Sequence, residues 1–417
     1  MAYLARVVDG GLRDSLNRAG AVLIEGPKSC GKTETARRVA ASQLQMDTDP
    51  SVPDAMAVDP GLLLSGRVPR LLDEWQDHPE IWNHVRHAVD DRGEPGQFIL
   101  TGSAVPRDDV RRHSGAGRFS RIRMRPMSLW ESRVSTGEVS LGDLLDGEVP
   151  RAPRSDLSAG DLADLVVRGG WPISRSYGIA AARAYARDYL GLLAEVDVPS
   201  VTGGRRDPVR VSRLLSSLAR NVASEASVST LARDVAGEGS TGVARDTVRD
   251  YLAALERLMV VEDQEPWNTA LRSAARLRKS VKRHFVDPSL AAAGMAADSS
   301  TLVRDLHTLG LLFESMVVRD LRVYAEPRGG RVFHYRDSND REIDAVVEFP
   351  GGAWIACEIK LGAGAVEAGA ESLKRAIAQI DTDRIGPPAA TVVVTGNGFG
   401  YRRPDGVDVV PIASLRP

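Results

Sequence analysis

The sequence predicts a multidomain α/β protein, and three observations support that fold class. With 417 residues, the chain is longer than one hydrophobic core usually serves. The first 150 residues or so alternate short apolar runs with helical patterns, as in a parallel sheet with crossover helices. From about residue 301, strand-like runs again alternate with helices, so a second, smaller α/β unit is expected after a mainly helical middle.

Composition and charge exclude several classes of protein. The chain has 43% hydrophobic and 26% charged residues, as in an ordinary globular protein. Its formal net charge of −2 provides no overall attraction to nucleic acid, so such binding requires a local basic patch. Cys30 and Cys357 are too few for a disulfide framework, and the histidines have no metal-ligand spacing with them.

No apolar run approaches the roughly 18 residues of a spanning helix, and the first residues read as an amphipathic helix rather than a secretion signal. We therefore expect a cytoplasmic protein with no membrane partner.

Shifts in composition predict the domain boundaries. A stretch rich in Gly, Pro, Ser and acidic residues at 142–161 predicts a boundary near residue 150. Helical patterns then continue to about residue 258, and two short helices joined by a Gly-rich turn resemble a helix-turn-helix. The strand-like runs that follow would form the wing of a winged helix. The expected parts are an α/β core over 1–150, a helical linker or lid over 151–205, a winged-helix-like domain over 206–290 and a small α/β domain over 291–417.

A phosphate-binding loop is predicted between the first strand-like run, AVLIE at 21–25, and the helical pattern after it. The eight residues GPKSCGKT match G-x-x-x-x-G-K-[ST] in the expected strand-to-helix context. Gly26 and Gly31 permit a tight loop whose N–H groups face phosphate, Lys32 reaches the β and γ oxygens, and Thr33 binds Mg²⁺. The alternative is a glycine turn that serves packing alone. The predicted contacts for ATP are Gly26, Pro27, Lys28, Ser29, Cys30, Gly31, Lys32 and Thr33.

Two later strand ends offer groups for hydrolysis. Asp73 and Glu74 end the apolar run RLLDE, where a Mg²⁺ ligand and a water-activating carboxylate are expected. A solvated strand edge is the alternative for this pair. The run FILTGSA ends in Thr101 and Ser103, either of which would hydrogen-bond the attacking water or the γ-phosphate, unless the strand simply leads into a helix cap.

An arginine-rich stretch follows these strands. It contains a glycine-bearing loop, and one arginine, such as Arg118, is a candidate to act in trans on the γ-phosphate of a neighbouring subunit. That role would require a homo-oligomer. A generic basic surface is the alternative.

Five motifs taken in order resemble one family. GPKSCGKT, LLDEWQ, FILTGSA, HSGAGRFSRIRMRPMSLWE and RGGWP are similar to motifs of prokaryotic AAA+ ATPases that carry a C-terminal domain of unknown function, DUF4143. The resemblance covers most of the chain. It implies an ATP-binding P-loop AAA+ core, a winged-helix-like middle and a final domain like a restriction endonuclease.

The last part of the sequence contains the residue types of a nuclease. Asp344 lies on one predicted strand, and Glu358 and Lys360 alternate on the next, so the latter two share a face of the sheet. With Glu314 from the preceding helix they resemble the PD-(D/E)XK pattern, in which Glu314, Asp344 and Glu358 would hold Mg²⁺ and Lys360 would position or activate water. The alternatives are a hairpin with alternating charges on its solvent face and a scaffold retained for binding alone.

A basic segment at 272–283 is the strongest candidate for contact with DNA or RNA. It combines six cations without an intervening acid, namely Arg272, Arg276, Arg278, Lys279, Lys282 and Arg283. A solvated loop, or one that docks on an acidic face of another domain, is the alternative. The predicted helix at 247–258 would enter a DNA groove, although Asp246 and Asp250 oppose base readout.

These observations predict an ATP-binding and ATP-hydrolysing protein that couples nucleotide state to nucleic-acid binding or processing by its C-terminal half. The alternatives are an ATP-gated, Mg²⁺-dependent nuclease and a nucleotide-regulated protein-binding switch or scaffold.

Overall fold

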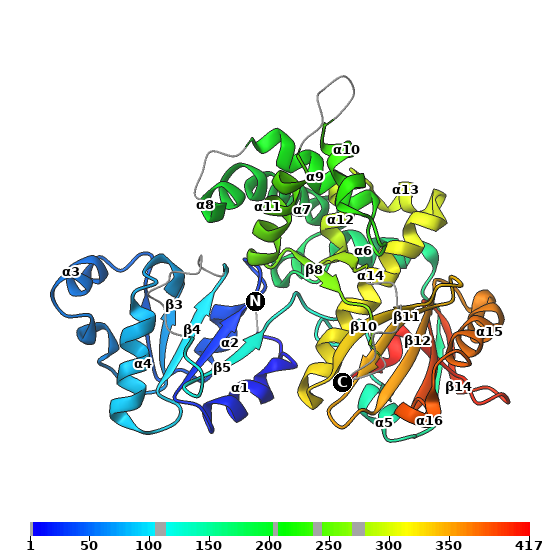
Figure 1. Cartoon of the computed structure of the whole chain (residues 1–417), viewed down its shortest axis with the longest axis horizontal. Coiled ribbons are helices and arrows are strands. Elements are labelled where there is room, and N and C mark those ends of the chain that lie inside the picture. The colour runs from blue at the N-terminus through cyan, green and yellow to red at the C-terminus, as the bar shows by residue number, and fades with distance from the viewer. Residues whose placement is uncertain (1–2, 105–113, 203–206, 237–243, 269–279) are drawn as a thin grey trace.

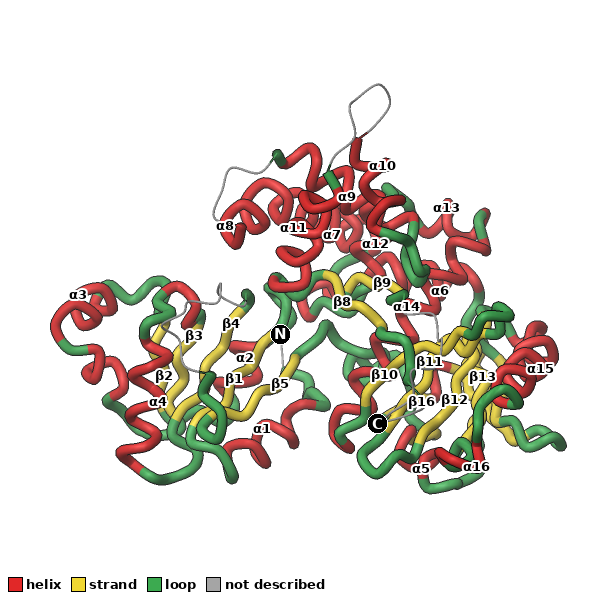
Figure 2. The backbone as a smooth tube through the Cα atoms, in the orientation of Figure 1, coloured by secondary structure: helices red, strands yellow, loops and turns green. Residues whose placement is uncertain are grey.

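A computed structural model describes residues 3–104, 114–202, 207–236, 244–268 and 280–417. The chain forms an N-terminal α/β lobe, a helical part above it and a C-terminal α/β lobe (Figure 1). Colouring by secondary structure separates the two sheets from the mostly helical part that joins them (Figure 2). The predicted α/β fold, with a parallel N-terminal sheet followed by helical and α/β regions, is confirmed.

The N-terminal lobe is built on a five-stranded, fully parallel sheet with the order β2-β3-β4-β1-β5. β1 and β4 lie inside this sheet, and their apolar side chains are almost wholly buried because helices cover both faces. The strands are β1 (Ala21–Glu25), β2 (Ser42–Gln45), β3 (Arg70–Asp73), β4 (Phe98–Gly102) and β5 (Phe119–Arg123). The helices are α1 (Val8–Leu16), α2 (Lys32–Arg37), α3 (Ser51–Val58) and α4 (Ile81–Arg92).

The middle of the chain is mostly helical. α9, α10 and α11 precede a two-stranded antiparallel sheet formed by β8 and β9, so helices and hairpin follow the order that a winged helix requires. The winged-helix assignment itself stays a prediction. The helices are α6 (Ala159–Arg168), α7 (Ile179–Leu192), a π-helical turn (Leu193–Asp197), α8 (Val198–Thr202), α9 (Pro208–Arg220), α10 (Val228–Ala236), α11 (Arg245–Arg257), α12 (Pro288–Gly294) and α13 (Ser299–Arg304), and the strands are β8 (Val261–Gln264) and β9 (Lys282–Phe285).

The C-terminal lobe contains a seven-stranded mixed sheet with the order β10-β11-β12-β13-β15-β14-β7. The long helix α14 (Leu306–Ala325) lies against β10, β11 and β12 and is almost wholly buried over its second half. The other elements are β10 (Arg331–Arg336), β11 (Glu342–Glu348), β12 (Trp354–Lys360), α15 (Val366–Ile377), α16 (Thr382–Ile385), β13 (Ala390–Thr395), β14 (Gly398–Arg402), β15 (Asp408–Pro411) and β16 (Leu415–Arg416).

Part of the segment between the lobes belongs structurally to the C-terminal lobe. β6 (Val139–Ser140) pairs with β16, and β7 (Ala152–Ser155) pairs with β14, with α5 (Leu141–Leu145) between them. The boundary expected near residue 150 therefore lies between two strands that both extend the C-terminal lobe, and the four predicted domain ranges stay predictions. Within the residues that the structure describes, no helix is long and apolar enough to cross a membrane.

Candidate functional site

The predicted phosphate-binding loop joins the carboxyl end of β1 to α2. Ser29 and Gly31 adopt left-handed backbone conformations, with φ of 63° and 104°. A Cβ atom added at Gly26 would lie 2.2 Å from the carbonyl oxygen of Met124, so only glycine fits that position without a shift of the backbone. The loop therefore needs its glycines for conformation at one end and for close backbone approach at the other.

Lys32 turns its ammonium group back into this loop. Its Nζ donates hydrogen bonds to the carbonyl oxygens of Gly26 at 3.0 Å and Pro27 at 2.9 Å, and the residue is buried. Neutral carbonyls are weaker partners for an ammonium group than anionic oxygens are. The lysine is thus held where a phosphate group, if present, would offer it better acceptors.

Asp73 accepts hydrogen bonds from hydroxyl groups of two neighbouring elements, α2 and β4. Its Oδ1 accepts a hydrogen bond of 2.9 Å from Thr33 Oγ1 and a short one from Thr101 Oγ1. Because β1, β3 and β4 are parallel, their carboxyl ends meet at one edge of the sheet, and residues from three separate parts of the sequence converge there. A carboxylate beside a threonine hydroxyl at the end of the loop fits a hydrated Mg²⁺, which takes oxygen ligands.

Glu74 is held beside Asp73 by a different pair of groups. Its backbone is left-handed, with φ of 55°, and its Oε2 accepts hydrogen bonds from Ser103 Oγ at 3.2 Å and from Gln76 Nε2. Thr101 and Ser103, which the sequence leaves as alternatives, therefore contact different carboxylates: Thr101 contacts Asp73, and Ser103 contacts Glu74.

Arg118 lies at the opposite edge of the sheet. Its carbonyl oxygen accepts from the N–H of Ala21 at the amino end of β1, whereas the loop follows the carboxyl end. The guanidinium group forms a bidentate ion pair with the exposed Asp90, with Nε 2.8 Å from Oδ1 and Nη2 3.2 Å from Oδ2. The structure does not bring Arg118 to the loop of its own chain, and its predicted action on a neighbouring subunit stays a prediction.

A cavity of about 410 Å³ borders the loop, and sequence reasoning did not anticipate most of its walls. Arg6, from the segment before α1, donates from Nη1 to the carbonyl oxygen of Cys30 at 2.9 Å and pairs with the buried Glu131 at 3.0 Å. Arg175 lines the same cavity from the helical part and lies three residues after the RGGWP motif, which ends at Pro172. The lining residues are Tyr3, Leu4, Arg6, Gly31, Glu34, Met127, Pro172 and Arg175.

The loop also touches the helical part directly. Lys28 Nζ lies 2.6 Å from Asp197 Oδ1 at the end of the π-helical turn, and Tyr189 on α7 donates to the carbonyl oxygen of Lys28 at 3.5 Å. Burial raises the pKa of Tyr189 well above its usual value, so its hydroxyl stays protonated and remains a donor. The loop is therefore in direct contact with α7 and with the turn that follows it.

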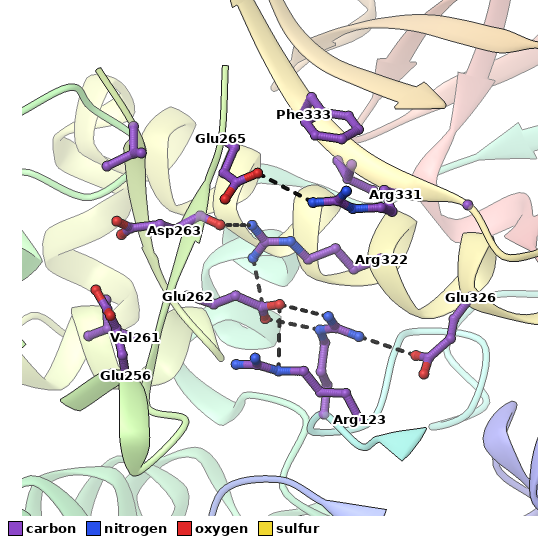
Figure 3. Close-up of a pocket in the computed structure, with 14 residues that line it drawn as sticks. Arg123, Glu256, Val261, Glu262, Asp263, Glu265, Arg322, Glu326, Arg331 and Phe333 are labelled. Atoms are coloured by element: carbon purple, nitrogen blue, oxygen red, sulfur yellow. Dashed lines mark hydrogen bonds and ion pairs between the residues drawn. The ribbon is translucent and has the colours of Figure 1, made fainter. Parts of the chain in front are cut away.

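A charged junction joins the N-terminal sheet to both other parts (Figure 3). Arg125, just after β5, pairs with Glu262 on β8 at 2.6 Å and with Glu326 after α14 at 3.3 Å, and Arg322 on α14 pairs with Glu262 at 3.4 Å. Although burial opposes a charge on Glu262, the nearby arginines hold its pKa well below the usual range. The cavity here, of about 470 Å³, is lined largely by charged side chains, several of which pair with one another across the parts.

The predicted residues of the C-terminal lobe do come together, with two additions. Asp344 Oδ2 accepts from the N–H of Ile359 at 2.7 Å, and Lys360 Nζ lies 2.8 Å from Glu358 Oε1. Lys282 of β9 enters the same cluster, with Nζ 2.8 Å from Glu314 Oε1 and 3.8 Å from Asp344 Oδ1. Glu342, also missed from the sequence, lies 2.5 Å from the same Nζ.

Burial strongly shifts the pKa values of this carboxylate cluster. Burial raises the pKa of Glu314 to about 8 and that of Glu358 to about 7. Burial disfavours the charge on Lys282, but attraction by Glu314, Asp344 and Glu342 outweighs it and raises the pKa of the ammonium group. Among the described residues, no group of three or more acidic, histidine or cysteine side chains is arranged to hold a metal ion. In this arrangement the ammonium group of Lys282 lies among Glu314, Glu342 and Asp344, and the role of Glu314, Asp344 and Glu358 as metal ligands stays a prediction.

Two of the six predicted nucleic-acid contacts are engaged inside the protein. Lys282 belongs to the carboxylate cluster, and Arg283 donates to the carbonyl oxygen of Ala226 at 2.7 Å and lies 3.7 Å from Asp263 Oδ1. Arg272, Arg276, Arg278 and Lys279 lie outside the described residues. The helix expected at 247–258 corresponds to α11, at whose start Asp246 forms an exposed pair with Arg249 at 2.6 Å.

Comparison with known proteins finds three domain families in the chain. An AAA domain matches residues 18–132, a domain of unknown function named DUF8612 matches 159–301, and DUF4143 matches 309–415. The resemblance drawn from the motifs, an AAA domain followed by a C-terminal DUF4143 domain, is confirmed. Its nuclease-like reading stays a prediction.

Similar proteins and structures also exist. Uncharacterized proteins of Mycobacterium bovis and Mycobacterium tuberculosis are each 28% identical over 348 residues, which is 82% of this chain and 70% of theirs. A solved structure, the Walker-type ATPase PABY2304 of Pyrococcus abyssi, is 14% identical with a TM-score of 0.42, covering 69% of this chain and 94% of that one.

Proposed function

We propose that this chain, which carries an AAA domain followed by a C-terminal DUF4143 domain, binds ATP with Mg²⁺ at residues 26–33 and hydrolyses it. The observation that carries the proposal is the convergence of Thr33, Asp73 and Thr101 at one edge of the parallel sheet, beside the loop into which Lys32 points. Such convergence of three separate segments is not needed for packing, since a buried carboxylate is costly to keep.

Binding follows from exchange of partners at Lys32. On arrival of the β- and γ-phosphates, its ammonium group would leave the carbonyl oxygens of Gly26 and Pro27 for anionic oxygens. The cavity of about 410 Å³ next to Gly31 falls within the range of small-molecule pockets and would receive the base and ribose against Tyr3, Leu4 and Met127. Arg175, which lines the same cavity, would add positive charge from the helical part.

Hydrolysis would use the neighbouring carboxylates. Thr33 and Asp73 would hold Mg²⁺, which neutralises charge on the phosphates when it is bound. Glu74 would accept a proton from the attacking water, and the hydrogen bond from Ser103 to Glu74 would fix the position of that carboxylate. Of the two predicted candidates, Ser103 then lies on the side of the water, and Thr101 supports Asp73.

Nucleotide state would be passed on through contacts of the loop. Phosphate would compete with Asp197 for Lys28, and the adjacent hydrogen bond from Tyr189 would change with it. We propose that this change acts on the helical part and, through the junction of Arg125 and Glu262, on the C-terminal lobe. Coupling to DNA or RNA would then depend on the basic residues of 272–279.

A nucleotide-regulated protein-binding switch is the second candidate function. It is favoured by the internal engagement of Lys282 and Arg283, which leaves fewer cations for a phosphate backbone than the sequence suggests. Salt-dependent binding of DNA or RNA would count against this candidate.

The test of the proposed function is a titration of the whole chain with ATP and Mg²⁺ by calorimetry. Lys32→Ala should weaken ATP binding by about 30-fold or more, since it removes charge-assisted hydrogen bonds worth about 2 kcal/mol. The matched control is Lys374→Ala, which removes a lysine from an exposed pair with Asp405 far from the loop. Equal ATP affinity in Lys32→Ala and the control would refute the assignment, provided that circular dichroism shows both variants folded.

A further inference from the structure

The nuclease-like pattern of the C-terminal lobe implies Mg²⁺ among Glu314, Asp344 and Glu358, and the structure disagrees with that implication. We infer that Lys282 fills the cation position of this carboxylate cluster. The cluster then attaches the β8–β9 hairpin to the C-terminal sheet, as a joint, and does not bind a divalent metal ion. This inference is independent of the proposed nucleotide site, which lies in the other lobe.

The geometry around the ammonium group is that of a satisfied cation. Lys282 Nζ lies 2.8 Å from Glu314 Oε1, 2.5 Å from Glu342 Oε1 and 3.8 Å from Asp344 Oδ1, and its side chain is only 4% exposed. An ammonium group has three N–H donors and no acceptor, so three carboxylates around it are suitable partners. Mg²⁺ requires near-octahedral oxygen ligands at about 2.0–2.1 Å, and it would have to share this volume with a positive charge. A divalent cation held by these carboxylates would be repelled by the buried ammonium group, so the metal and the charged lysine compete for the same oxygens.

The position of Lys282 in the cluster is set by the contacts of its strand, β9. β9 pairs with β8, and Gln264 of β8 donates from Nε2 to the carbonyl oxygens of Phe333 and Asp344, both at 2.9 Å. The buried His284 follows Lys282 on β9, and its ring nitrogens lie 3.0 Å from Gln264 Oε1 and 3.2 Å from Ser315 Oγ on α14. The β8–β9 hairpin is thus attached to both α14 and the C-terminal sheet, and this attachment holds the lysine in place.

The consequence concerns what the C-terminal lobe does. Asp344, Glu358 and Lys360 lie as the nuclease pattern predicts, but the charge that a metal would balance is already balanced by a residue of the middle part. The cluster therefore holds the hairpin against the sheet. In this state the lobe is a binding scaffold, and it has no means to activate water with a divalent ion.

The experiment measures Mn²⁺ uptake by the nucleotide-free, full-length protein with electron paramagnetic resonance of free Mn²⁺. The proteins are the wild type, Asp344→Asn, Lys282→Ala, the double variant Lys282→Ala/Asp344→Asn, and the control Lys374→Ala. The wild type, Asp344→Asn and Lys374→Ala should take up Mn²⁺ equally. Lys282→Ala should bind one Mn²⁺ in addition to those of the wild type, with an affinity at the cluster at least about tenfold above that of the wild type, and the double variant should lose this ion.

Two results would overturn the inference. One is Mn²⁺ binding by the wild type that Asp344→Asn abolishes, because Lys282 would then yield to the metal. The other is a folded Lys282→Ala that gains no Mn²⁺, because the position would then not be one for a cation. If Lys282→Ala does not fold, the pair of wild type and Asp344→Asn decides the question, with Lys282→Met as the variant that keeps the apolar stem.

Discussion

Two sites of this protein combine a buried lysine with nearby carboxylates, and they differ in the groups that the lysine contacts. At the N-terminal site Lys32 is bound to two neutral carbonyl oxygens, and Asp73 is bound separately by hydroxyl groups. At the C-terminal cluster Lys282 is bound directly to Glu314 and Glu342, with Asp344 close by.

The difference explains which site is open to a ligand. A lysine on carbonyl oxygens gains by exchanging them for a phosphate, and a carboxylate on hydroxyl groups remains free to ligate a metal. A lysine surrounded by carboxylates already has the strongest partners that a protein offers, and its removal from them is costly. Similar residue types therefore fit the proposed nucleotide site in one lobe and the proposed joint in the other.

The largest effect is expected for a substitution of Glu74 at the N-terminal site. It should stop ATP hydrolysis and leave ATP binding intact. Glu74→Gln keeps the shape and the contact with Ser103 but loses the proton acceptor, so ATP turnover should fall by about 10²–10⁴-fold. Steady-state phosphate release and calorimetric ATP affinity measure the two halves of this prediction, with and without single- and double-stranded DNA. Wild-type turnover in the variant would remove Glu74 from the mechanism.

The next effect is on stability, at Lys282. Lys282→Ala leaves three acidic groups without their cation and should lower the free energy of unfolding by about 3–5 kcal/mol. Lys374→Ala, from an exposed pair, should change it by less than about 1 kcal/mol. Urea unfolding followed by circular dichroism compares the two, and equal losses would mean that Lys282 is not the centre of a buried joint.

The smallest effect on stability is expected for a substitution of Arg118. The same variant tests whether this arginine acts on a neighbouring subunit. Its pair with Asp90 is exposed, so Arg118→Ala should leave the free energy of unfolding and the ATP affinity unchanged. If the arginine acts on a neighbouring subunit, turnover should nevertheless fall, and wild-type turnover per chain should rise with protein concentration. Unchanged turnover in Arg118→Ala at every protein concentration would assign it to the surface.

Much of the N-terminal site could be predicted because its signals are local. GPKSCGKT is contiguous, so its turn and lysine are specified by neighbours in sequence. Asp73 and Thr101 follow from one further rule, that parallel strands carry their carboxyl ends to a common edge. Hydrophobic runs of four or five residues were enough to locate those strands, since a buried parallel strand is apolar on both faces.

The C-terminal cluster and the cavity beside the loop depended on contacts that no local pattern records. In sequence, Lys282 lies in a basic run without acidic neighbours, yet in space its partners come from α14 and β11. Arg6 likewise contacts the loop from the segment before α1, and Arg175 lines the cavity beside the loop from the helical part. The sequence by itself determined the residue types, the strands and the phosphate-binding loop, because these depend on periodicity and short-range backbone geometry. Tertiary structure alone decided which cation faces which carboxylate, because the Coulomb interaction depends on distance and burial in space and not on separation along the chain.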